Sequence, residues 1–144
     1  MRVDGRWFLC ADGVIRPVIR VAVFSVDRVP VQRHFLVDTG ADRTVLSREL
    51  LDELGLATAK SVVQLAGVSG AFETVEVVAE LRLRRTGGGE VLIQSRFAAA
   101  TDPNALEMSV LGRDITGIFA LIIDRPGDVV CLVNQQHRYS ISTT

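Results

Sequence analysis

Short apolar runs separated by turn residues constrain the fold of this chain more than any other feature. Turn-forming groups such as Asp12-Gly13 and residues 87–89, 102–104 and 126–128 divide the sequence into these runs. Residues 81–84 (Leu-Arg-Leu-Arg) alternate apolar and polar side chains, which is typical of a sheet with one buried face. We predict strands at residues 7–10, 14–26, 31–37, 61–67, 71–85, 90–99, 120–124 and 129–134. The pattern therefore predicts an all-β protein, either a compact barrel or a sandwich.

Helices are predicted at two places. Ser47 is a suitable N-cap for a short helix that runs through Leu54, and Gly55 is a suitable left-handed stop. A second, shorter helix is predicted after Asp114, ending near residue 117 or 119. The alternation of strands and helices found in nucleotide-binding domains is missing. The glycines at 87–89 precede a predicted strand, so they indicate a hairpin turn and not a phosphate loop.

Length and charge limit the classes of protein to which this chain can belong. The chain has 144 residues, which predicts one domain over residues 1–144. Its 16 basic and 17 acidic residues give a net charge of -1, without a basic stripe interleaved with aromatics, so we expect no nucleic-acid partner. No apolar run is long enough for a membrane span, and residues 1–7 do not resemble a secretory signal. We therefore expect no membrane partner and a cytoplasmic location.

The residues that most often bind metals are scattered. Cys10 and Cys131 are far apart in sequence and fit no metal or redox spacing, so both are predicted to be small core residues. His34 and His137 are likewise isolated from other ligand types. We predict no metal site and no cofactor.

Asp38 is the residue that packing alone does not explain. It directly follows the apolar stretch at residues 35–37, where an ionised carboxylate is costly unless it is paired or hydrogen-bonded. Gly40 permits a tight turn that aims peptide N–H groups at that acid. Asp38 is therefore predicted to be a functional residue.

Three segments resemble the retropepsins, the retroviral-type aspartic proteases. Residues 36–46, which include Asp38-Thr39-Gly40, resemble the active-site loop of that family. Residues 65–72 resemble its glycine-rich flap, and residues 110–114 resemble the hydrophobic-hydrophobic-glycine element beneath the catalytic loop. The resemblance covers about residues 14–124 and implies a closed β-barrel of the acid-protease type. Residues 125–144 are predicted to form a closing hairpin strand and a tail, as in single-lobe cellular and bacterial relatives.

The resemblance implies an aspartic endopeptidase that cleaves peptides or proteins without a cofactor. Such enzymes use two carboxylates that share one proton. This chain contains a single Asp-Thr-Gly, so a homodimer is required, with one Asp38 from each subunit. Asp38, Thr39 and Gly40 are the predicted catalytic residues.

The remaining site residues follow from the same resemblance. Gly112 belongs to the element beneath the catalytic loop, and Ala41 stands where many relatives have serine. Asp42 and Arg113 match an ion pair near the dimer contact, with Arg16 as a second arginine. The predicted flap and cleft residues are Leu65, Gly67, Val68, Ser69 and Gly70, and Val37 and Ile115 could extend the cleft or belong to the core.

Three other interpretations compete with the protease. The first is a non-proteolytic, dimeric binding module with the retropepsin fold. The second is an aspartyl-phosphate enzyme, which needs a second acid two residues after the first, where this chain has Gly40, as well as Mg²⁺ and alternating helices. The third is a purely structural dimer.

Overall fold

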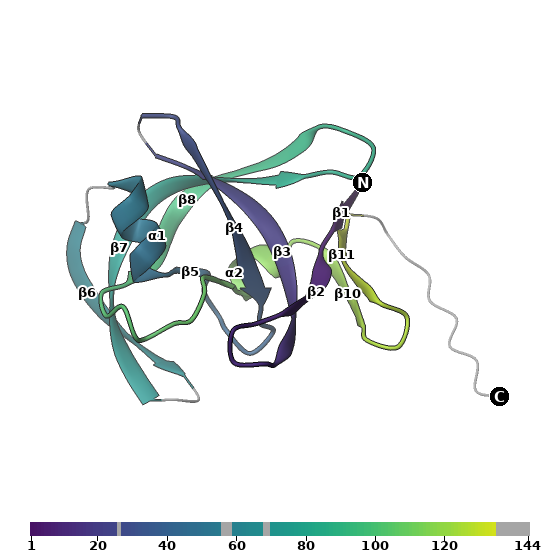
Figure 1. Cartoon of the computed structure of the whole chain (residues 1–144). Helices are drawn as coiled ribbons and strands as arrows, with labels where there is room; N and C mark the ends of the chain where they lie inside the picture. Colours follow the sequence, from purple (N-terminus) through teal and green to yellow (C-terminus); the bar gives the residue numbers. More distant parts are fainter. Residues whose placement is uncertain (26, 56–58, 68–69, 135–144) are drawn as a thin grey trace.

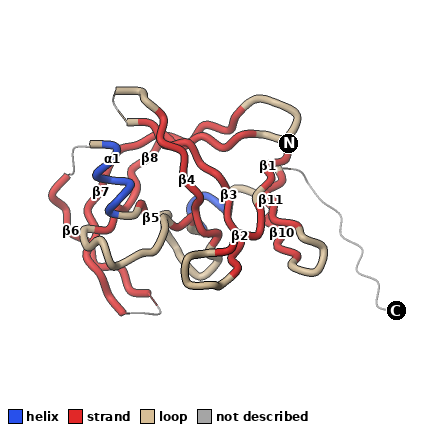
Figure 2. The backbone as a smooth tube through the Cα atoms, viewed as in Figure 1, coloured by secondary structure: helices blue, strands red, loops and turns tan. Residues whose placement is uncertain are grey.

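The computed structural model describes residues 1–25, 27–55, 59–67 and 70–134, and strands dominate these ranges (Figures 1 and 2). Two short helices lie among them, α1 (Arg48–Leu54) and α2 (Arg113–Thr116). The strands are β1 (Arg2–Asp4), β2 (Arg6–Leu9), β3 (Ile15–Phe24), β4 (Pro30–Val37), β5 (Val45–Leu46), β6 (Ala59–Gly67), β7 (Gly70–Arg84), β8 (Glu90–Ala100), β9 (Val110–Leu111), β10 (Ala120–Asp124) and β11 (Val129–Val133). The predicted all-β class is confirmed.

The strands form two sheets. The smaller sheet has the order β1-β11-β10 and is antiparallel throughout. The larger sheet has the order β2-β3-β4-β9-β5-β8-β7-β6, and β3 also pairs with β7. This additional pairing brings the two halves of the larger sheet back together around the core.

The main apolar core lies inside these sheets. Side chains from β3, β4, β7 and β8 supply most of it, and α1 contributes three leucines. Val3 of β1 and Leu132 of β11 are buried in the same core, so the smaller sheet packs against the larger one. The largest fully buried side chains are Phe35, Phe97, Ile19, Leu46, Leu50, Leu81, Leu83, Leu111, Ile115 and Leu132.

The local signals in the sequence correspond to the structure. The Ser47 hydroxyl accepts a hydrogen bond from the N–H of Leu50 at 3.3 Å, as an N-cap does. Gly55 ends α1 in the left-handed conformation, with φ of 57°. Residues 87–89 all have positive φ and close the β7–β8 hairpin. The closing hairpin β10–β11 is also confirmed, whereas the tail at residues 135–144 lies outside the described residues.

Three strands were not predicted. β1 lies at residues 2–4, where no strand was predicted, and it pairs with β11 at the other end of the chain. β5 and β9 are two residues long and pair with each other and with β8 and β4, respectively. All three depend on partners far away in sequence, so no local periodicity reveals them.

Neither of the described helices is long or apolar enough to cross a membrane. Cys10 and Cys131 are both buried and unpaired, which confirms their prediction as core residues.

Gly5 connects the two sheets, and we call this connection the joint. It separates β1 from β2, and its N–H donates to the carbonyl of Val130 at 2.7 Å. A Cβ atom at this position would press against the carbonyl oxygen of Val18 and lie 2.9 Å from side-chain atoms of Ile19 and Val130. The joint therefore has no room for a side chain.

We predict that Gly5→Ala lowers the free energy of unfolding by about 1–3 kcal/mol, because overpacking forces backbone and side chains apart. Urea unfolding followed by circular dichroism measures the change. Leu9→Ala is the control, since Leu9 is 65% exposed and its truncation should cost little. Equal stability of the wild type and Gly5→Ala would contradict the tight joint.

Candidate active site

The Asp38 loop follows the end of β4 and is fixed by backbone hydrogen bonds. The N–H of Asp38 donates to the carbonyl of Leu111 at 3.2 Å, and the N–H of Ala41 donates to the carbonyl of Asp38 at 3.2 Å. The N–H of Gly40 donates to Oδ1 of Asp38 at 2.9 Å. Asp38 is half-buried, and Thr39 and Gly40 are exposed. The loop thus presents a hydrogen-bonded carboxylate at an accessible surface.

β9 supports this loop from inside the molecule. It runs parallel to β4, pairing Val37 with Leu111, and antiparallel to β5, pairing Val110 with Val45. The Asp38 loop connects β4 to β5. Because β9 pairs with both of these strands, one short strand holds both ends of the loop. Leu111 is fully buried, which anchors the support in the core.

Gly112 is required where the chain passes under the loop. A Cβ atom there would lie 2.5 Å from the carbonyl oxygen of Arg43 and 2.8 Å from the nitrogen of Thr44. Its φ is -90°, so the close approach of the two backbones, and not an unusual conformation, excludes larger residues. The structure therefore places Gly112 in direct contact with the segment that follows Asp38.

Asp114 and Thr44 lock the two segments together. The Asp114 carboxylate accepts the N–H of Thr44 at 2.9 Å and the Thr44 hydroxyl at 2.7 Å. The same hydroxyl accepts the N–H of Gly112 at 3.0 Å. Thr44 is fully buried, so its bond to Gly112 is shielded from water, whereas Asp114 is exposed and its bonds to Thr44 are partly buried. Sequence reasoning did not assign either residue to the site, although both lie within the motif segments at residues 36–46 and 110–114.

Arg113 contacts the loop on its exposed side. The Arg113 guanidinium forms an ion pair with Asp42. The backbone N–H of Arg113 donates to the carbonyl of Ala41 at 2.8 Å. The two side chains are 58% and 79% exposed, so the ion pair itself contributes little to stability. The backbone bond orders the loop, and the ion pair fixes where the two charges lie.

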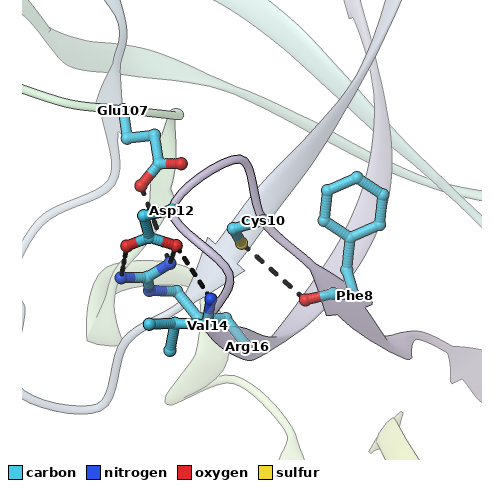
Figure 3. A network of polar contacts seen from close by, with 6 residues as sticks. All are labelled: Phe8, Cys10, Asp12, Val14, Arg16 and Glu107. Carbon is cyan, nitrogen blue, oxygen red and sulfur yellow. Dashed lines mark hydrogen bonds and ion pairs between the residues drawn. The ribbon is translucent and has the colours of Figure 1, made fainter.

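Within the described chain Arg16 pairs with Asp12 and not with Asp42, and its place as a second arginine near the dimer contact stays a prediction. Its guanidinium donates to Asp12 at 2.8 and 2.6 Å, and Glu107 reaches the same group at 3.6 Å (Figure 3). Hydrogen bonds from Arg16 and then from the N–H of Val14 lower the pKa of Asp12 to about 2. Asp12 is four residues from Arg16 across a tight hairpin, so it reaches the arginine with little loss of chain entropy.

The Arg16 cluster contains the only described group with metal-ligand spacing. Ligand atoms of Cys10, Asp12 and Glu107 lie within 4.8 Å of one another. The Arg16 guanidinium already contacts both carboxylates, however, and supplies the positive charge that they need. The arrangement is therefore an arginine-centred ion cluster.

The β6–β7 hairpin contains the predicted flap. Gly67 pairs with Gly70, and Gly70 has a φ of 113°, a conformation that suits the end of a tight hairpin. Val68 and Ser69 lie outside the described residues. Leu65 is half-buried against a small apolar cluster that contains Val45.

Val37 and Ile115 face the interior and not a cleft. Val37 is 5% exposed and Ile115 is 2% exposed, and both belong to the main core. Of the two readings that the sequence left open for this pair, the core is the one that the structure supports.

Comparisons with known proteins agree with this geometry. Residues 21–115 match the model of a family described as "Aspartyl protease". EIAV protease, in complex with the inhibitor HBY-793, is similar in structure with a TM-score of 0.52 and 27% identity, over 71% of this chain and 86% of that one. A retropepsin-like aspartic protease from Rickettsia conorii has a TM-score of 0.54 and 20% identity, over 92% of this chain and 97% of that one. At 20% identity, the similarity to the Rickettsia conorii protein shows only that the two proteins share a fold. Among curated proteins, none matches the chain.

We predict that Thr44→Val lowers the free energy of unfolding by about 1–3 kcal/mol, because the buried N–H of Gly112 loses its acceptor. Thr44→Ser keeps the hydroxyl and should cost less. Urea unfolding of the three proteins measures the difference. If the valine and serine variants were equally stable, the hydroxyl would have no role in joining the segments.

Proposed function

Because the chain belongs to the aspartyl protease family, we propose that it is an endopeptidase that acts as a homodimer, with Asp38 of each subunit in one shared site. The observation that carries this proposal is the Asp38 loop, in which an accessible carboxylate accepts the N–H of Gly40 and the backbone N–H of Asp38 donates to the carbonyl of Leu111. The family match includes the whole loop. The fold shared with EIAV protease and the Rickettsia conorii protein supports the same conclusion.

The need for two copies follows from chemistry. Hydrolysis of an amide requires one group that removes a proton from water and another that protonates the substrate. Two adjacent carboxylates do both, because repulsion between like charges keeps one protonated while the other is ionised. The sequence has a single Asp-Thr-Gly, so a second copy must supply the second acid.

The reaction then proceeds in two steps. The ionised carboxylate takes a proton from a water molecule, whose oxygen attacks the peptide carbonyl, while the protonated carboxyl donates to the carbonyl oxygen. In the second step the C–N bond breaks, the leaving nitrogen takes the proton that the first carboxylate removed from water, and the other carboxylate takes a proton from a hydroxyl of the tetrahedral intermediate, so an acid and an amine result. No covalent enzyme intermediate and no cofactor are required.

The other site residues have supporting roles in this proposal. Thr39 is exposed beside Asp38, where its hydroxyl can bond to the second subunit beneath the two acids. Asp42 and Arg113 flank the loop on the same side. The β6–β7 hairpin, with Leu65 and residues 67–70, serves as the flap that closes over the substrate.

We predict that Asp38→Asn lowers peptide cleavage by about 10²–10⁴-fold or more, because each dimer loses both its acid and its base. Digestion of a peptide library, with products identified by mass spectrometry, measures the loss. Asp128→Asn is the matched control, since Asp128 is 81% exposed on the β10–β11 hairpin and should leave cleavage unchanged.

Three results would overturn the assignment. Cleavage that persists in Asp38→Asn would place the chemistry at another residue. A wild-type protein that is dimeric yet cleaves no library peptide would favour a non-proteolytic binding module. Activity that requires magnesium would instead indicate an aspartyl-phosphate enzyme.

We further predict that specific activity falls on dilution, because a monomer has half of the catalytic pair. Activity per subunit should decline over the same concentration range in which sedimentation shows the dimer dissociating. Added Asp38→Asn protein should also inhibit the wild type by forming mixed dimers. Activity that stays constant per subunit where sedimentation shows only monomers would disprove the shared site.

A further inference from the structure

A groove lies where β2 leaves the edge of β3 and β7 joins it. β3 pairs with β2 through residues 15–18 and with β7 through residues 21–24, so residues 19 and 20 have neither neighbour. Two cavities of about 380 and about 490 Å³ adjoin there and share Asp4, Arg20 and Gln32. The loop of the β7–β8 hairpin approaches β1 above them, and the N–H of Thr86 donates to the carbonyl of Arg2 at 2.8 Å (Figure 1). We call these two cavities together the basic groove.

Positive charge dominates the basic groove. Its lining includes five arginines and two acids, and these are Arg6, Arg20, Arg33, Arg82, Arg84, Asp4 and Glu90. Both acids already bond to other residues of the chain. Asp4 bonds to Arg2 at 2.6 Å and to the Thr86 hydroxyl at 2.5 Å, and Glu90 lies 3.2 Å from Arg82. The chain as a whole has a net charge of -1, so this local excess does not reflect its composition.

Two of these arginines are unpaired within the described part of the chain. Arg33 forms an ion pair with Glu53, and Arg82 bonds to Glu80 at 2.6 Å. Arg20 and Arg84, in contrast, make no hydrogen bond or ion pair to another described residue. Both are exposed, and Arg20 lines both cavities while Arg84 lines the larger one, so an incoming anion could bind them without displacing an acid.

Arg6 and His34 form the end of the groove on the side of β4. The Arg6 guanidinium donates to Nε2 of His34 at 3.2 Å. Burial, with Arg6 and Arg20 nearby, lowers the pKa of His34 below its ordinary 6.5, so the ring is neutral at pH 7 and accepts this bond. The contact fixes the direction of Arg6 without neutralising its charge.

We propose that the basic groove binds an acidic segment of the protein substrate. The inference rests on the proposed function, because it extends the substrate contacts of the same enzyme. Arginine forks match carboxylate groups in a bidentate manner, and the two adjoining cavities suit an extended peptide better than a compact ion. β4 leads from His34 at the groove to Asp38, four residues or about 13 Å away. One substrate chain can therefore reach both places.

The expected result is a preference for acidic residues several positions away from the cleaved bond. Binding at the groove would raise the affinity of the substrate without changing the chemical step. It should therefore lower KM and leave kcat nearly unchanged. The effect should weaken as salt is added, because it depends on exposed charges.

Direct binding tests the groove separately from cleavage. A fluorescein-labelled peptide rich in Asp and Glu is titrated with the full chain carrying Asp38→Asn, which binds without cutting, and anisotropy gives Kd. A peptide with Asn and Gln in place of the acids is the ligand control. We expect R20E/R84E to raise Kd for the acidic peptide at least about tenfold, since two attractive charges become repulsive. R96E is the protein control, because Arg96 is exposed on β8 and does not line the groove.

Each outcome decides a different claim. Equal binding of the acidic and neutral peptides, or a Kd that R20E/R84E does not change, would overturn the proposal that the basic groove binds an acidic segment. Duplex DNA that displaces the peptide at equal or lower concentration would overturn its assignment to a peptide. Arginine-dependent binding in a protein whose wild type cleaves nothing would overturn the protease proposal and still support acidic-peptide recognition. A KM advantage of acidic substrates that disappears in R20E/R84E would support both.

Discussion

The bonds between Asp114 and the buried Thr44 are the constraint on which the candidate site depends. They join the segment after Asp38 to the start of α2, across 70 residues of sequence. Gly112 lets the two backbones touch, and β9 then lies between β4 and β5. An acid at a loop tip would otherwise sample many positions. Here its backbone is held at both ends by strands anchored in the core, so the direction of the Asp38 carboxylate is set by the fold and not by its own surface contacts.

The sequence alone predicted the features that depend on interactions between residues close together in the chain. The Ser47 cap, the Gly55 stop and the glycine turn at residues 87–89 act within a few residues, and all appear where expected. β1, β5 and β9 were missed because their partners are distant in sequence. The roles of Asp114 and Thr44 were missed for the same reason. The roles of Asp38, of the flap and of the second subunit, and the single domain, stay predictions.

Arg16 has local partners that a resemblance to a family does not predict. The resemblance named it as a second arginine near the Asp42–Arg113 pair at the dimer contact. In this chain Asp12 lies four residues away and Glu107 lies opposite, and both reach the guanidinium first. Asp42 instead pairs with Arg113, which the close packing around Gly112 brings next to it. A partner within the same hairpin costs less chain entropy than a remote one, and the family pattern carries no information about it.

The proposed catalytic loop and the proposed substrate-binding groove lie at different places along the same strand, β4. β4 ends at the Asp38 loop, where backbone bonds leave one carboxylate accessible. Farther back along β4, Gln32 and His34 line a groove whose central arginines have no described counter-ion. The first site demands a fixed geometry, because proton transfer depends on distances of a few ångströms. The second needs only charge of the right sign over a wide area, so its arginines can vary in position without disturbing the loop. Under this proposal, substrate preference can change through surface arginines, while the bonds that hold the Asp38 loop stay constant.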